Sequence, residues 1–152
     1  MEVIDLITPS SVIASLRTTD KSRLLQELAA RATRLLPIDS QTVLDALHSR
    51  EMLGSTGVGQ GIALPHARIP RLREFFGLFA RLERPIEFEA IDERPVDLVF
   101  LLLIPEQAGD DHLAALACVS RKLRDPAVAQ ALRTRKTAPE LYKVLTVETH
   151  TA

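Results

Sequence analysis

The sequence predicts an α/β fold in which a mixed β-sheet of about five strands is flanked by helices on both faces. The segment from Leu98 to Ile104 is apolar at every position, as expected for a strand covered on both sides. Segments with helical spacing of apolar residues precede and follow it. The chain has 152 residues, of which 46% are hydrophobic, and can therefore bury a core. We expect residues 1–152 to form a single domain.

The first half of the chain predicts one weak strand, Val12–Leu16, and two helices. Asp20 is the expected N-cap of the first helix, and Pro37 is expected to end it. Its predicted inward residues are Leu24, Leu25, Leu28, Ala32, Leu35 and Leu36. The second helix is expected to run from Ser40 to just before Gly54. Its predicted inward residues are Val43, Leu44 and Leu47.

The second half predicts two longer strands followed by helices. The strands are Phe75 to Leu82 and Val96 to Ile104, with a turn at 92–95 between them. Asp110 or Asp111 is expected to cap the next helix. The inward residues predicted for that helix are Leu113, Leu116, Ala117 and Leu123. Asp125 with Pro126, and the capping box from Thr137 to Glu140, predict two further helices.

Charge and cysteine content restrict the functional class. A formal net charge of -1 provides no overall attraction for nucleic acid or an anionic membrane, so neither partner is expected. The basic residues from Arg121 to Lys136 are most simply a solvated helix surface. Cys118 is the only cysteine, which excludes an internal disulfide and is expected to fill space in a helix. Because no signal peptide or membrane-spanning run is present, we expect a cytoplasmic protein.

The candidate functional segment runs from Gly54 to His66. It contains four glycines within eight residues, Gly54, Gly57, Gly59 and Gly61. Such a loop leaves amide N–H groups uncovered and can curl around an anion. Residues 62–64 have strand character, and Pro65 favours an extended conformation at Leu64. His66 is then expected at a strand end beside the loop, and residues 67–73 are expected to form a polar connection. A neutral imidazole there has one nucleophilic nitrogen, as phosphoryl transfer requires.

Less specific interpretations of this segment remain open. The loop lacks the lysine of a nucleoside triphosphate-binding loop, because Gln60 stands there, and it lacks the third glycine of a dinucleotide-binding turn, because Ile62 stands there. A purely connective loop is about equally compatible with the composition. A serine hydrolase that uses Ser55 and His66 lacks a nucleophile elbow and an identified carboxylate. His48 and His150 have the character of surface residues.

Two further side chains suit an anion site. Arg50 lies in the last turn before the loop, and its guanidinium has a fixed fork of donors that matches phosphate oxygens. Its alternative interpretation is an ordinary surface position. His112 lies in the first turn of a predicted helix, where amide dipoles favour an anion. In isolation it is more often a solvent-facing residue. Ser55 and Thr56 can donate hydroxyls to the anion or simply stabilise the turn.

The segment from Arg50 to Ala67 strongly resembles the active-site segment of the fructose/mannitol-type IIA domains of the bacterial phosphotransferase system. The positions that carry the resemblance are Glu51, Val58, Gly59, Ile62, Ala63, Leu64, Pro65, His66 and Ala67. The segments 90–98 and 111–113 are also similar to the family. The wording Leu-Gly-Ser-Thr-Gly, and a chain without transport or IIB segments, resemble the nitrogen-related branch.

The resemblance implies a phosphocarrier, a phosphotransferase component and not a stand-alone metabolic enzyme. By position, His66 is the implied phosphoryl acceptor, with Arg50 and His112 around it. Ser55, Thr56, Gly57 and Gly59 are expected phosphate-binding residues. The implied donor is a phosphohistidine carrier protein of the HPr or NPr kind, and no cofactor or metal is needed. Implied regulatory targets include potassium-transport regulators and sensor kinases, and monomer and homodimer stay open.

Two alternatives compete with this regulatory function. A sugar-specific IIA subunit would use the same chemistry at His66 and pass the phosphoryl group to a IIB partner. A pure interaction module would keep the fold without being phosphorylated. The second alternative is disfavoured because such a module need not keep His66, Arg50 and His112 together.

Overall fold

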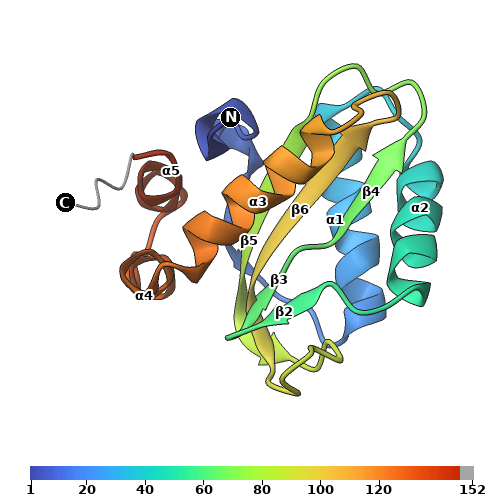
Figure 1. Ribbon diagram of the computed structural model, residues 1–152. Coiled ribbons are helices and arrows are strands. Elements are labelled where there is room, and N and C mark those ends of the chain that lie inside the picture. Colours follow the sequence, from blue (N-terminus) through green and yellow to red (C-terminus); the bar gives the residue numbers. More distant parts are fainter. Residues whose placement is uncertain (148–152) are drawn as a thin grey trace.

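The computed structural model describes residues 1–147 and shows one mixed sheet of six strands covered by helices on both faces (Figure 1). The predicted fold class is therefore confirmed. In chain order the elements are η1 (Val3–Asp5), η2 (Pro9–Ser11), β1 (Val12–Leu16), α1 (Lys21–Leu35), α2 (Ser40–Met52), β2 (Gly57–Gly59), β3 (Ile62–Ala63), β4 (His66–Ile69), β5 (Phe76–Ile86), β6 (Val96–Pro105), α3 (Asp111–Arg124), α4 (Pro126–Thr134) and α5 (Ala138–Thr146).

Strand β6 is the centre of the sheet, and its apolar run is buried throughout as the sequence predicts. Along the main path the strand order is β1-β5-β6-β3-β2, and β4 also pairs with β6. β6 is antiparallel to β5 and parallel to β3 and β4. Alternate β6 side chains enter two different cores. Val99, Leu101 and Leu103 face α1 and α2, whereas Leu98, Phe100 and Leu102 face α3, α4 and α5.

β3 and β4 behave as one strand that is interrupted for two residues. Ile62 pairs with Leu98 and His66 pairs with Leu102, so both strands keep the same register against β6. The interruption falls at Leu64 and Pro65, because proline has no N–H to donate to the ladder. The prediction that His66 ends a strand and that residues 67–73 form a connection is therefore wrong for residues 66–69, since His66 is the first residue of β4.

Helix termini agree with the capping residues in the sequence. Asp20, Asp39, Asp125 and Thr137 each accept a hydrogen bond from a backbone N–H in the first turn of the following helix. α1 ends at Leu35, two residues before Pro37. For α3 the N-cap is Asp110, whose side chain makes no capping bond. Two other helix ends lie closest to the candidate site: α2 ends at Met52, just before the glycine-rich segment, and α3 begins at Asp111, one residue before His112.

The predicted inward faces are correct for α2 and partly wrong for α1 and α3. In α1, Leu35 is 45% exposed. In α3, Leu113 is 60% exposed, and the buried residues are Ala115, Val119 and Leu123. Small side chains at two of these positions let α3 pack closely on the sheet, and Leu113 points outward. Within residues 1–147, none of the helices has the length and apolar character that a bilayer crossing needs.

Candidate functional site

The site is built around His66, which lies at the start of β4 with its side chain partly exposed. Its Nδ1 lies 2.8 Å from the carbonyl oxygen of Leu64. A carbonyl oxygen only accepts, so Nδ1 carries the proton and donates it. The break between β3 and β4 leaves the Leu64 carbonyl available for this bond. The Nε2 atom of a neutral His66 therefore keeps its lone pair.

The surroundings of His66 favour the neutral imidazole. Burial lowers the pKa of His66 from its ordinary value, because desolvation penalises the charged ring. The hydrogen bond to Leu64 acts in the opposite direction. The positive charge of Arg50 lowers the pKa further, Glu51 raises it, and His112 lowers it. A neutral ring near pH 7 is the form that has a nucleophilic nitrogen.

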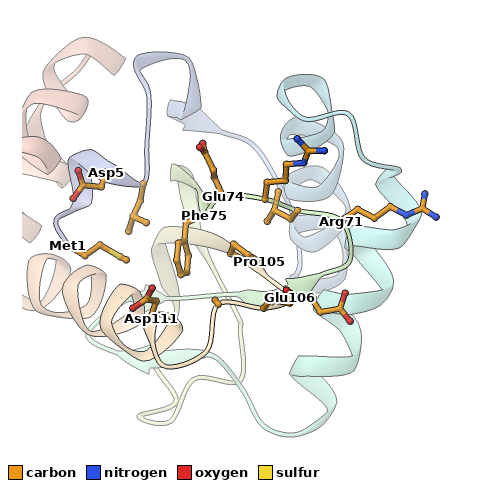
Figure 2. A pocket seen from close by; sticks show the side chains of 13 residues that line it. Met1, Asp5, Arg71, Glu74, Phe75, Pro105, Glu106 and Asp111 are labelled. Atoms are coloured by element: carbon orange, nitrogen blue, oxygen red, sulfur yellow. The ribbon is translucent and has the colours of Figure 1, made fainter.

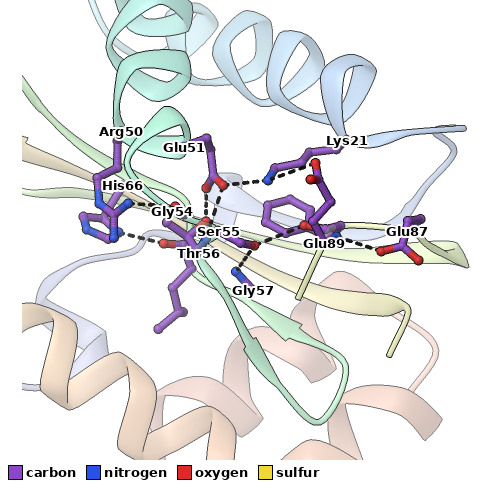
Figure 3. Close-up of polar contacts among 12 residues, drawn as sticks. Lys21, Arg50, Glu51, Gly54, Ser55, Thr56, Gly57, His66, Glu87 and Glu89 are labelled. Atoms are coloured by element: carbon purple, nitrogen blue, oxygen red, sulfur yellow. Dashed lines mark hydrogen bonds and ion pairs between the residues drawn. The ribbon is translucent and has the colours of Figure 1, made fainter. Parts of the chain in front are cut away.

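Arg50 comes to His66 from the C-terminal turn of α2. Figure 3 shows the two side chains next to each other, and Arg50 Nη1 donates a hydrogen bond to the Gly54 carbonyl oxygen at 2.9 Å. This bond holds the guanidinium at the C-terminal end of α2, against the backbone that leaves the helix. The structure thus places Arg50 beside His66. A guanidinium in this position can meet an anion on His66.

The glycine-rich segment has a different structure from the expected anion-binding loop. Gly57–Gly59 forms β2, which pairs antiparallel with β3, and the turn contains Gln60 and Gly61 with positive φ. Gly57 packs so tightly on Ala90 that an added Cβ would lie 2.8 Å from the Ala90 Cα atom. A Cβ added at Gly59 would lie 3.3 Å from a carboxylate oxygen of Asp92. These surroundings explain why glycine stands at both positions, and the Gly57 N–H is already bonded to Ser55 Oγ at 3.0 Å. Phosphate binding by Gly57 and Gly59 stays a prediction.

Ser55 and Thr56 are also engaged within the protein (Figure 3). The Ser55 hydroxyl donates to the Phe88 carbonyl oxygen at 3.1 Å and accepts from Gly57 N at 3.0 Å. Thr56 is buried, its hydroxyl donates to Glu51, and its backbone N–H donates to Glu51 Oε2 at 3.2 Å. Their hydroxyls therefore hold the segment in shape, which is the turn-stabilising alternative that the sequence left open.

Glu51 and Lys21 form the support beneath this segment. Lys21 Nζ lies 2.8 Å from Glu51 Oε2, and the two side chains are 18% and 7% exposed. The same ammonium lies 4.5 Å from the centroid of the Phe88 ring. In the sequence, Glu51 was marked only by the family resemblance, and Lys21 was not predicted to have a role. The link joins α1, the end of α2 and the segment before β2, and no local pattern could reveal it.

His112 lies in the first turn of α3, as predicted, and is partly exposed. Its Nδ1 is 2.7 Å from the Gly109 carbonyl oxygen and 3.0 Å from Nη2 of Arg68. Its effect on the pKa of His66 shows that the two imidazoles are within electrostatic range. Arg68 had no assigned role in the sequence analysis. The alternation of β4 places Arg68 on the same face as His66, a relation that required knowing that β4 exists.

Other histidines and possible ligand groups lie outside this arrangement. His48 is exposed on α2, and His150 falls outside the described residues. Within residues 1–147 there is no cluster of three or more histidine, cysteine, aspartate or glutamate side chains suited to a metal ion. Cys118 is half-buried in α3, and burial raises the pKa of its thiol. This thiol is therefore poorly suited to nucleophilic chemistry.

Two hollows of the described surface lie away from His66. One, of about 1090 Å³, is bordered by η1, the connection after β4 and the loop before α3 (Figure 2). Its lining includes Asp5, Glu74, Glu106 and Asp111 but none of Arg50, His66 or His112. A second hollow, of about 1190 Å³, continues along the same connection. The first hollow is lined by carboxylates and also by Arg71 and Arg73, and neither hollow includes His66.

Comparison with known proteins gives the family. Residues 5–147 match the family model described as phosphoenolpyruvate-dependent sugar phosphotransferase system, EIIA 2. The chain belongs to this EIIA family. A Bradyrhizobium diazoefficiens protein named nitrogen regulatory protein is 49% identical, covering 100% of this chain and 99% of the relative. A Haloferax volcanii protein named as a fructose-specific EIIA component is 36% identical, covering 95% and 97% of the two chains.

A solved structure agrees with this assignment. The nitrogen regulatory protein IIA-Ntr of Neisseria meningitidis superimposes with a TM-score of 0.89 at 33% identity, covering 95% of this EIIA chain and 99% of that chain. The resemblance to the nitrogen-related branch is thus shown by both sequence and structure. The EIIA chain presents the partly exposed imidazole of His66 with Arg50 beside it, and this is the arrangement that a function must explain.

Proposed function

We propose that the EIIA chain is a regulatory phosphocarrier that accepts a phosphoryl group on Nε2 of His66. The observation that carries this proposal is the hydrogen bond from His66 Nδ1 to the Leu64 carbonyl. It fixes the tautomer and the ring plane, and it leaves one nitrogen with a lone pair at a partly exposed position. The lowered pKa of His66 supports the same form of the ring.

The transfer step follows from these atoms. The Nε2 lone pair of His66 attacks the phosphorus of a phosphohistidine on the donor, the new N–P bond forms, and the donor N–P bond breaks. The bonding electrons return to the donor imidazole nitrogen, and His66 keeps its Nδ1 proton on Leu64. Arg50 and His112 are proposed to donate to the phosphoryl oxygens, which carry the charge throughout in-line transfer. The donor supplies the free energy, so we propose that neither metal nor cofactor takes part.

The exposed apolar side chains around the site favour a protein as the donor. Met52 and Leu53 follow Arg50 and are 86% and 84% exposed. Leu113 follows His112 and is 60% exposed. Apolar side chains on the surface next to polar reacting groups are typical of protein docking sites. We propose a phosphohistidine carrier protein of the HPr or NPr kind as the donor.

Regulation is proposed to follow from the added charge. Phosphorylation adds close to two negative charges at His66, next to an apolar surface that a target protein can bind. The similarity to proteins named nitrogen regulatory protein supports a regulatory role, and we propose as targets the potassium-transport regulators or sensor kinases that the family resemblance implies. We propose that residues 1–152 act as one domain and that this relay operates in the cytoplasm, where phosphoenolpyruvate is made.

A second candidate is a sugar-specific IIA subunit that passes the phosphoryl group to a IIB partner. The fructose-specific name of the Haloferax volcanii relative favours it. The two functions share the acceptor and differ in the destination of the phosphoryl group. Rapid removal of the label by a purified sugar-specific IIB would support the second candidate, and a stable label with phosphorylation-dependent target binding would support the first.

The test of phosphoryl acceptance is intact-mass measurement after incubation with phosphoenolpyruvate, enzyme I and the carrier protein. We expect the unmutated chain to gain one phosphoryl group and His66→Ala to gain none. The matched control is His48→Ala, which removes an exposed histidine on α2 and should leave the mass gain unchanged. An unchanged mass of the unmutated chain, while the carrier becomes phosphorylated, would instead support a non-phosphorylated interaction module.

A further inference from the structure

Two groups compete for one nitrogen of His112. Nδ1 lies 2.7 Å from the Gly109 carbonyl oxygen, which can only accept, and 3.0 Å from Arg68 Nη2, which can only donate. A protonated Nδ1 would satisfy Gly109 and place two N–H groups against each other at Arg68. An unprotonated Nδ1 would accept from Arg68 and would leave the Gly109 carbonyl oxygen facing a lone pair instead of a donor. The choice decides which nitrogen of a neutral His112 carries the proton.

Arg68 is well placed to make that choice. Its Nη1 donates to the Glu106 carbonyl oxygen at 2.9 Å, so the guanidinium is anchored to the loop between β6 and α3. Gly109 of the same loop contacts His112. The alternation of β4 directs Arg68 to the face on which His66 lies. Arg68 therefore connects the face of β4 that carries His66 to the loop before α3, next to His112.

We propose that Arg68 is a positioning residue that holds His112 in the tautomer with the proton on Nε2. The argument rests on the proposed function, because a phosphoryl group on His66 offers only acceptor oxygens. A neutral His112 can donate to those oxygens only through Nε2–H, and this leaves Nδ1 needing a donor. Arg68 Nη2 is that donor. A doubly protonated ring would place the Nδ1 hydrogen against Arg68 Nη2 at 3.0 Å, so Nδ1 could not accept that hydrogen bond.

The direct test is the tautomer of His112 in the isolated, ¹⁵N-labelled protein. Long-range ¹H–¹⁵N correlation spectra at a pH of about 8, above the ordinary imidazole range, distinguish protonated from unprotonated ring nitrogens. The signals are assigned with His112→Gln. We expect an unprotonated Nδ1 in the unmutated chain and a shift of the proton toward Nδ1 in Arg68→Met. Arg73→Met, an exposed arginine in the connection after β4, is the matched control and should leave the signals unchanged.

A kinetic cycle tests whether Arg68 acts through His112. Arg68→Met should slow phosphoryl uptake about tenfold, and Arg68→Lys, which keeps one donor, should restore part of the rate. In a His112→Gln background, Arg68→Met should have no further effect. Equal effects in both backgrounds would overturn the positioning role, as would a protonated Nδ1 in the unmutated chain or identical tautomers with and without Arg68. Those results would leave His66 phosphorylation intact, whereas failure of the mass gain would remove the proposed function without altering the tautomer measurement.

Discussion

Replacing Glu51 by glutamine removes the negative charge that joins α1, α2 and the segment before β2. In the unmutated chain, the carboxylate pairs with Lys21 Nζ at 2.8 Å and accepts from both the backbone N–H and the hydroxyl of Thr56. Because the Glu51 side chain is 7% exposed, solvent cannot replace these partners. Glutamine can still accept from Thr56, but its amide leaves Lys21 without its closest negative charge.

The expected loss follows from two contributions. A hydrogen bond to a charged group contributes about 1.5–3 kcal/mol, and a part of this is lost when the acceptor becomes neutral. Unpairing a buried charge costs about 3–5 kcal/mol, reduced here because Lys21 is 18% exposed and has Glu89 at 3.9 Å. We therefore expect Glu51→Gln to lower the free energy of unfolding by about 2–4 kcal/mol.

Urea denaturation measures this change, and a double-mutant cycle assigns it. With an m-value of about 2 kcal/mol per molar urea, the midpoint should fall by about 1–2 M. Lys21→Met should remove much of the same energy, so the double variant should be more stable than the two separate losses predict. A loss below about 0.5 kcal/mol for Glu51→Gln, or simple additivity with Lys21→Met, would refute the reasoning.

Three further predictions concern the site and its support. Gly57→Ala should cost about 1–3 kcal/mol in urea denaturation, because its Cβ would lie 2.8 Å from Ala90, and a neutral result would show that β2 can shift. Arg50→Met should slow phosphoryl uptake about 100-fold in a timed mass assay, and a rate near that of the unmutated chain would exclude Arg50 from the transfer step. Because the pKa of His66 is lowered by burial, the unfolded chain binds that proton more readily; unfolding free energy should therefore fall as pH drops below about 6.5, and less steeply in His66→Gln. Equal pH slopes for the two proteins would contradict the lowered pKa.

The parts of the fold that could be predicted are those set by local chemistry. The run from Leu98 to Ile104 is buried because its apolar side chains must be covered on both faces, and the structure confirms it as β6. Asp20, Asp125 and Thr137 cap helices as predicted because capping depends on residues within one turn. Such interactions are written in consecutive residues, so they need no knowledge of the rest of the chain.

The missed strands depend on pairing more than on the strand propensity of their own residues. Gly57–Gly59 contains two glycines, which are depleted in strands, and becomes β2 by pairing with β3. β4 follows Pro65, which indicated a break, but β6 offers ladder positions on both sides of the interruption. The inward face of α3 was misassigned because both Leu113 and Ala115 fit a helical stripe. Only the docked helix shows that the smaller side chain is the buried one.

The site shows the same division. The resemblance implied that Arg50 and His112 lie around His66. In the structure, burial lowers the pKa of His66, and both residues lower it further. Phosphate binding by Ser55 and Thr56 depends on which way these residues point. In the structure, hydrogen bonds to Phe88 and Glu51 set that orientation. Arg68 was passed over because its partner His112 lies 44 positions away in the sequence. Tertiary contacts of this kind leave no periodicity to read.

The central claim is that Nε2 of His66 is the phosphoryl acceptor, and the bond itself can be observed. The chain, labelled with ¹⁵N-histidine and phosphorylated by the carrier protein, should show phosphorus coupled to Nε2 of His66, with Nδ1 still protonated and bonded to Leu64. Coupling of phosphorus to Nδ1 of His66, or to a nitrogen of any other histidine, would contradict the account.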